Sequence, residues 1–164
     1  PGNNGERCLT VGARDRTARL WKIPEETQLV FRGNAVEESG NDAAAGGSTS
    51  LDATSAIDGE HFVTGTEGGS LQVWGTHKKR PLVSHDLAHA GPIHSLLALR
   101  LTDLVISGSE DGKVSFWALD TNGYRQMDLL GSIAVKGVIN GIATDATGSK
   151  IAIVAGRDAR LGRW

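Results

Sequence analysis

Four segments of the chain end in its only four tryptophans, and this repeat limits the fold more than any other feature. The segments are 12–21 (GARDRTARLW), 65–74 (GTEGGSLQVW), 108–117 (GSEDGKVSFW) and 155–164 (AGRDARLGRW). A small residue lies nine positions before each tryptophan: Gly12, Gly65, Gly108 and Ala155. The tryptophans are 53, 43 and 47 residues apart. A period of about 40–45 residues is typical of a repeated sheet of four short strands.

Each copy has the chemistry of a β-hairpin. In the third copy an apolar run, 104–107, is followed by the turn 110–112 (Glu-Asp-Gly) and a second run, 113–117. Asp and Gly tolerate the positive φ that tight hairpins need. Residues of the second run alternate between the two faces of a strand, and each run is too short and too tightly bounded by Gly for a helix.

The repeat places strands along the whole chain, in four groups. The first group is 8–12, 17–23 and 27–32, and the second is 51–57, 61–66, 70–75 and 81–87. The third is 93–99, 104–109, 113–119 and 124–130, and the fourth is 138–144, 150–155 and 160–164. Residues 34–50 are small and polar, with three acids and no base. We predict that they form a flexible insertion within one domain, 1–164, and that they lengthen the first spacing.

The pattern resembles the WD-repeat family, although Lys22, Gly75 and Ala118 stand where that family often has Asp after Trp. The resemblance implies an all-β fold, a partial WD-repeat β-propeller of about three and a half blades. Closed propellers need at least four complete blades and commonly have seven, so we expect the protein to continue beyond both ends. The family often ties a blade with a His, Ser/Thr, Asp and Trp tetrad. The third copy matches all four positions: His89, Ser107, Asp111 and Trp117.

A narrower resemblance lies in residues 6–33, in 62–82 with its WGTHKKRPL stretch, and in the terminal RLGRW. These segments are similar to the WD-repeat subunits of U-three box C/D small nucleolar ribonucleoproteins. The resemblance implies a nucleolar scaffold without catalytic activity that binds the U-three RNA and acts in early pre-18S RNA processing. It implies a kink-turn-binding protein and other processome proteins as partners. The alternative is a general protein-interaction propeller, such as a substrate receptor.

Basic residues provide the candidate contacts for RNA or partners. Lys78, Lys79 and Arg80 follow a third strand, whereas Arg14, Arg16 and Arg157 lie at turns between second and third strands. By family resemblance these two kinds of loop lie on opposite rims. Such clusters bind phosphate backbones, but solvated charges on blade surfaces are the ordinary explanation for them. Arg19 and Arg163 fall within predicted strands, where a structural role is expected.

Other chemistry is less well supported by the sequence. The net charge is −2, so no overall basic field favours nucleic acid. Three histidines, His85, His89 and His94, lack the spacing of a zinc motif, and GSEDGKVS lacks the spacing of a phosphate loop. We expect no metal, cofactor, membrane span or catalytic site. The single cysteine, Cys8, is expected to be a small core residue.

Overall fold

The computed structural model describes residues 6–32, 50–100 and 102–159, and all regular structure in these ranges is β-sheet. The strands are β1 (Arg7–Gly12), β2 (Thr17–Lys22), β3 (Thr27–Arg32), β4 (Leu51–Ala56), β5 (His61–Thr66), β6 (Leu71–Gly75), β7 (Val83–His85), β8 (Ile93–Ala98), β9 (Leu104–Ser109), β10 (Lys113–Leu119), β11 (Met127–Ala134), β12 (Val138–Thr144) and β13 (Ile151–Gly156). Within these ranges no helix has the length and apolar character needed to cross a membrane.

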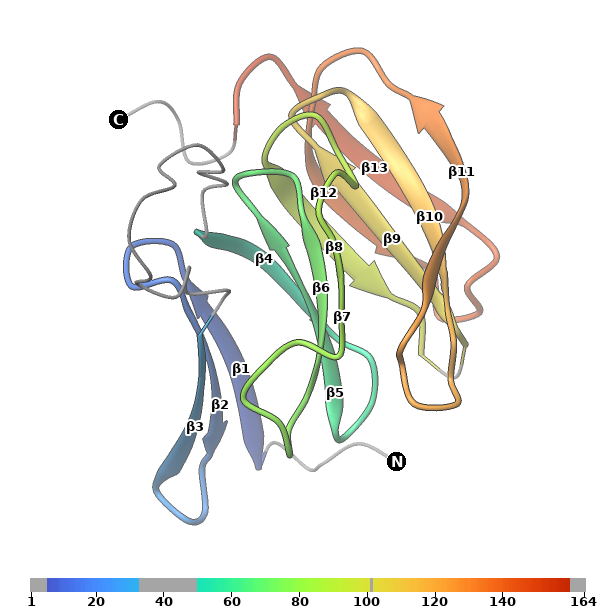
Figure 1. Ribbon diagram of the computed structural model, residues 1–164. Coiled ribbons are helices and arrows are strands. Elements are labelled where there is room, and N and C mark those ends of the chain that lie inside the picture. The colour runs from blue at the N-terminus through green and yellow to red at the C-terminus, as the bar shows by residue number, and fades with distance from the viewer. Residues whose placement is uncertain (1–5, 33–49, 101, 160–164) are drawn as a thin grey trace, which may run out of the picture.

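The strands form four separate antiparallel sheets that follow one another along the chain (Figure 1). Their orders are β1-β2-β3, β4-β5-β6-β7, β8-β9-β10-β11 and β12-β13. Each sheet is a meander in which sequence neighbours pair, so short turns suffice as connections. The prediction of an all-β fold built from consecutive small sheets is confirmed, and two of the four sheets in the described residues have four strands.

The predicted strands agree with the observed ones except near the outer edges of the sheets. The outer strand of the third sheet is predicted at 124–130 but runs from Met127 to Ala134. The reason is a contact between sheets: the hydroxyl of Tyr124 donates to Asp58 Oδ2 at 2.9 Å, which holds the preceding turn against the second sheet. The predicted strand 160–164 and the predicted insertion 34–50, apart from the buried Ser50, lie outside the described residues.

Neighbouring sheets bury their facing side chains against one another. The first two sheets share a cluster of Ala18, Leu20, Phe31, Leu51, Phe62 and Trp74. Between the second and third sheets the core includes Val63, Val73, Ile93, Val105 and Trp117. Ile106, Val114 and Ile139 join the third sheet to the fourth. The second and third tryptophans therefore pack against the preceding sheet, which explains their burial.

The small residue nine positions before Trp74 and Trp117 is a packing requirement. A Cβ at Gly65 would lie 2.6 Å from Ile93 Cγ2, and a Cβ at Gly108 would lie 2.4 Å from Ile139 Cγ2. Each isoleucine belongs to the first strand of the next sheet, so the missing side chain lets two sheets approach closely. The repeated glycine thus follows from the stacking of sheets.

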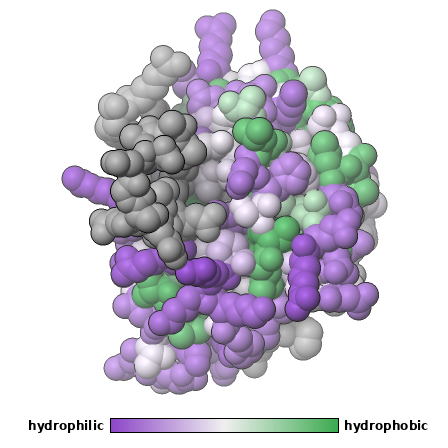
Figure 2. Space-filling view, viewed as in Figure 1, coloured by the Kyte–Doolittle hydropathy of each residue, from purple (hydrophilic) through white to green (hydrophobic). Residues whose placement is uncertain are grey.

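Hydrophobic side chains stay exposed on the faces that no described sheet covers. Trp21 is 37% exposed on the first sheet, in contrast to the buried Trp74 and Trp117. Figure 2 shows a hydrophobic surface over β11, where Leu129, Leu130 and Ile133 are exposed. Cys8 is also exposed, so its expected place in the core is wrong. It pairs with Trp21 and lies on the same uncovered face.

Candidate functional site

The third sheet holds His89, Ser107, Asp111 and Trp117 in one hydrogen-bonded chain. His89 Nε2 lies 2.7 Å from Ser107 Oγ, and His89 Nδ1 lies 3.1 Å from Asp111 Oδ2. Trp117 Nε1 donates to Ser107 Oγ at 2.8 Å. The backbone N–H groups of Ala90 and Lys113 also donate to Asp111, at 3.0 and 2.9 Å. These hydrogen bonds therefore hold the segment before β8 against the hairpin of β9 and β10.

A neutral His89 satisfies every polar group in this chain. With its proton on Nδ1, His89 donates a hydrogen bond to Asp111. Its Nε2 accepts a hydrogen bond from the Ser107 hydroxyl, and the oxygen of that hydroxyl accepts one from Trp117. Burial lowers the pKa of His89, and the charge and hydrogen bond of Asp111 only partly oppose that effect. Burial raises the pKa of Asp111, but the backbone donors of Ala90 and Lys113 together with His89 bring it below its ordinary value. The geometry is that of a structural tie, with each donor already paired.

Two other sheets keep the tryptophan and hydroxyl half of this arrangement. Trp74 Nε1 donates to Thr64 Oγ1, and Trp21 Nε1 donates to Thr10 Oγ1, both at 2.9 Å. In each of the three sheets the tryptophan pairs with one residue of the neighbouring strand. The hydroxyl residue lies two positions after that paired residue in the sequence. Gly68 replaces the carboxylate in the second sheet, so that sheet depends more on apolar packing.

Lys78, Lys79 and Arg80 lie between β6 and β7, and we call this segment the basic loop. Its base is held by backbone hydrogen bonds: Lys78 N donates to Gly75 O at 3.0 Å, and Leu82 N donates to Val73 O at 2.7 Å. All three basic side chains are exposed. Lys78 and Lys79 have no ion-pair partner among the described residues, so their charges are available to an outside anion.

Glu60, in the turn between β4 and β5, fixes the start of the basic loop. Its backbone oxygen accepts from Thr76 N at 2.8 Å, and its carboxylate accepts from the Thr76 hydroxyl. The same carboxylate contacts His77 Nε2 at 3.0 Å and Arg7 Nη1 at 3.4 Å. The hydrogen bond from Thr76 is the largest cause that lowers the pKa of Glu60, followed by Arg7 and His77. Glu60 therefore stays ionised and links the first sheet to the basic loop.

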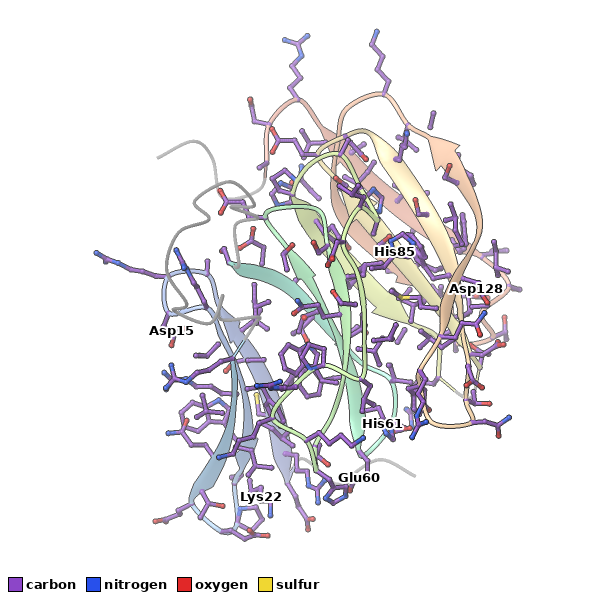
Figure 3. The ribbon with its side chains drawn as sticks, viewed as in Figure 1. Asp15, Lys22, Glu60, His61, His85 and Asp128 are labelled. Carbon is purple, nitrogen blue, oxygen red and sulfur yellow. The ribbon has the colours of Figure 1, made fainter. Side chains whose placement is uncertain are left out.

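Asp58 in the same turn reaches the third sheet. Its carboxylate lies 2.9 Å from His61 Nδ1 and accepts from the Tyr124 hydroxyl at 2.9 Å. The rings of His61 and Tyr124 are 4.1 Å apart. Burial and then the hydrogen bond to Asp58 raise the pKa of Tyr124 to about 12. Through Asp58 and Glu60 one short turn contacts three sheets beside the basic loop (Figure 3, His61 and Glu60).

Arg14, Asp15 and Arg16 form the turn between β1 and β2, which we call the arginine turn. It lies at the opposite end of the sheets from Lys22, Glu60 and His61 (Figure 3). Asp15 accepts from Thr17 N at 3.2 Å and from Arg19 Nη2 at 2.7 Å. Hydrogen bonds with Thr17, and then those with Arg19, lower the pKa of Asp15. Arg19 thus has the structural role expected for it, while Arg14 and Arg16 are exposed without an ion-pair partner among the described residues.

Arg157 lies beside an acidic pocket at the same end of the molecule. The pocket has a volume of about 370 Å³ and is lined by residues that include four acids: Asp52, Glu67, Glu110 and Asp158. His94 Nε2 is 3.5 Å from Glu110 Oε2. Carboxylates at this density repel phosphate, so the surroundings of Arg157 suit RNA less well than those of the basic loop. The described residues contain no group of His, Cys, Asp and Glu that could hold a metal ion.

Comparison with known proteins adds to this geometry. The pattern of the WD domain, G-beta repeat, matches residues 81–118. A solved structure of U3-55K superposes with a TM-score of 0.83 at 40% identity, over 97% of this chain and 47% of that one. The chain belongs to the WD40 repeat family. The four sheets are accordingly blades of a WD40 propeller, and the predicted fold class of a partial propeller is confirmed.

Two relatives of this WD40 chain have names that refer to ribosomal RNA or small nucleolar RNA. Ribosomal RNA-processing protein 9 of Saccharomyces cerevisiae is 32% identical over 97% of this chain and 38% of its own length. U3 small nucleolar RNA-interacting protein 2 of Homo sapiens is 40% identical over 85% of this chain and 28% of its own length. The chain thus spans well under half the length of these curated relatives.

The structure adds residues that the sequence pattern did not indicate. Asp58, Glu60 and Tyr124 hold the surroundings of the basic loop, yet none of them belongs to the tryptophan repeat. Tyr124 is 66 residues from Asp58, and Arg7 is 53 residues from Glu60, so no local spacing could have paired them. The only available signal was the Asp-Gly-Glu turn before β5, which predicts a hairpin and no contact beyond it.

Proposed function

We propose that this chain is part of a scaffold, without catalytic activity of its own, in the U3 small nucleolar ribonucleoprotein. In this proposal it binds the U3 RNA in the nucleolus and acts in early pre-18S RNA processing. Its protein partners would be a kink-turn-binding protein and other subunits of the small-subunit processome. The observation that carries the proposal is the agreement of fold and sequence with U3-55K over 97% of the chain.

The basic loop is the RNA contact that the geometry supports best. Lys78 and Lys79 are adjacent, exposed and unpaired within the described part of the chain, while Glu60 holds the base of their loop. Two adjacent ammonium groups repel each other unless an anion lies between or beside them. A fixed loop base also lowers the ordering cost of binding, because the loop need not find its conformation when RNA arrives.

Crosslinking in cells tests the proposal directly. RNA recovered with the tagged intact protein should be dominated by one species, the U3 small nucleolar RNA. The matched comparison is the same protein with Lys78, Lys79 and Arg80 replaced by alanine, which should give fewer crosslinks at an equal protein level. Recovery of proteins but no enriched RNA would instead support a general protein-interaction propeller and overturn the proposal.

A further inference from the structure

Arg16 occupies a backbone conformation that the sister blades give to glycine. The residue five positions before the tryptophan closes the turn in three blades: Arg16, Gly69 and Gly112. All three have positive φ, at 57°, 80° and 75°. A side chain in this left-handed region is disfavoured by contact of its Cβ with the following carbonyl oxygen, whereas glycine adopts it freely. Of these three blades, the first therefore has an arginine at a position where glycine would adopt the backbone conformation without cost.

The contacts of the first blade do not explain this arginine as a structural residue. Asp15 receives hydrogen bonds from Thr17 and Arg19, and neither of these involves the side chain of Arg16. Arg16 is exposed and makes no ion pair with any described residue. Tyr124, which also has positive φ, differs in this respect, because its hydroxyl and its ring contact Asp58 and His61. Strained residues that the fold does not use are often kept for binding.

The local charge indicates the kind of ligand. Because Asp15 is paired with Arg19, the arginine turn presents Arg14 and Arg16 on either side of a neutralised acid, and neither guanidinium group has an ion-pair partner within the described part of the chain. Arg157 and Ala13, the residue before the arginine turn, line the acidic pocket on this rim, whereas Arg14 and Arg16 are not among its lining residues. A guanidinium can bind a phosphate with two parallel hydrogen bonds and can stack on an unpaired base. An RNA backbone fits these features.

We infer that the arginine turn is a second RNA-binding surface, on the rim opposite the basic loop, with Arg16 as its main contact. This inference rests on the proposed function, because it takes the RNA to be the one that the basic loop binds. The RNA, or two segments of it, would then contact both rims of the propeller. The contact is electrostatic and reads the phosphate backbone, with stacking available wherever a base is unpaired.

Arg16→Gly separates binding from folding in the intact protein. The glycine removes the unfavourable Cβ, so the melting temperature should equal or exceed that of the wild type. Affinity for the U3 RNA should fall by about tenfold, the usual scale for one charge-assisted hydrogen bond. The slope of log K against log salt should become flatter by about one unit, as expected for one lost phosphate contact. Arg16→Lys should keep most of the salt slope, because it keeps the charge.

Glu26→Gly is the matched control, because Glu26 has a φ of 50° in the turn after β2 and carries no cation. This variant should also melt at or above the wild-type temperature, but RNA affinity should not fall. A lower melting temperature for Arg16→Gly would show that the fold needs the arginine and would overturn the inference. Unchanged RNA affinity would overturn it too, including the case in which only a protein partner is lost. If the wild type itself binds no U3 RNA, the proposed function fails first.

Discussion

Asp111→Ala should lower the free energy of unfolding by about 1–3 kcal/mol, the range expected when buried donors lose a charged acceptor. Asp111 accepts from His89 and from the backbone N–H groups of Ala90 and Lys113. Alanine leaves these donors without a partner, and the side chain of His89 is fully buried. Chemical denaturation of the intact protein measures the change. Spectroscopic probes near β8 and β9 should detect the loss of stability, because the hydrogen bonds of Asp111 hold the segment before β8 to β9.

Asp128→Ala is the control for this variant. Asp128 lies on β11 of the same blade and is exposed, and within the described residues its carboxylate accepts hydrogen bonds from the side chain of Gln126. Its removal should change the unfolding free energy by no more than about 0.5 kcal/mol. Equal effects of the two substitutions would show that the His89, Ser107, Asp111 and Trp117 chain adds nothing to stability.

Acid should weaken the same chain of hydrogen bonds. The pKa of His89 is lowered in the folded state from its ordinary 6.5, so the unfolded chain binds this proton more readily. Stability from His89 is therefore complete above about pH 6.5 and decreases as the pH falls below that value. The pKa of Asp111 is also lowered, so its contribution disappears only at a more acidic pH, below its ordinary 3.8. Chemical denaturation should give a lower free energy of unfolding at pH 5.5 than at pH 7. The difference between the two pH values should be smaller in the His89→Gln variant.

Replacing Lys78, Lys79 and Arg80 together by alanine should weaken binding of the U3 RNA by tenfold or more. Each phosphate contact contributes about one unit to the slope of log K against log salt, so the slope should become flatter by about two to three units. Folding should be unaffected, because exposed side chains in a loop contribute little to stability. Titration of the labelled RNA at several salt concentrations measures both quantities.

A matched variant separates the basic loop from net charge. Arg100, Arg125 and Lys150 are exposed on turns at the same end of the blades as the basic loop, so their joint replacement by alanine removes the same charge. That variant should keep most of the affinity, because these three residues are dispersed over separate turns. If both triple variants lose the same RNA affinity, the RNA is attracted by the net charge of the whole rim and the basic loop has no special role. Unchanged RNA binding together with loss of one protein partner would assign the basic loop to a protein contact.

The tryptophan repeat alone determined the strands and their grouping into blades. Hairpins depend on local chemistry. A turn such as Glu110-Asp111-Gly112, and the alternation of side chains between the two faces of the next strand, can be recognised within ten residues. The four positions of the His89, Ser107, Asp111 and Trp117 chain were predicted by family resemblance, because they recur at fixed offsets from the tryptophan. These features need no knowledge of what lies beside each blade.

Contacts between blades were decided only by the tertiary structure. Arg7 and Glu60 meet from different blades, as do Asp58 and Tyr124, and Arg157 comes to lie at an acidic pocket. The exposure of Cys8 and Trp21 likewise depends on whether another sheet covers their face. The left-handed backbone of Arg16 was also shown only by the structure, because the sequence hints at it solely through the glycines at the matching positions 69 and 112. The physical reason is that hairpin formation depends on neighbouring residues, whereas charge pairing and burial depend on which distant surfaces the stacked blades bring together.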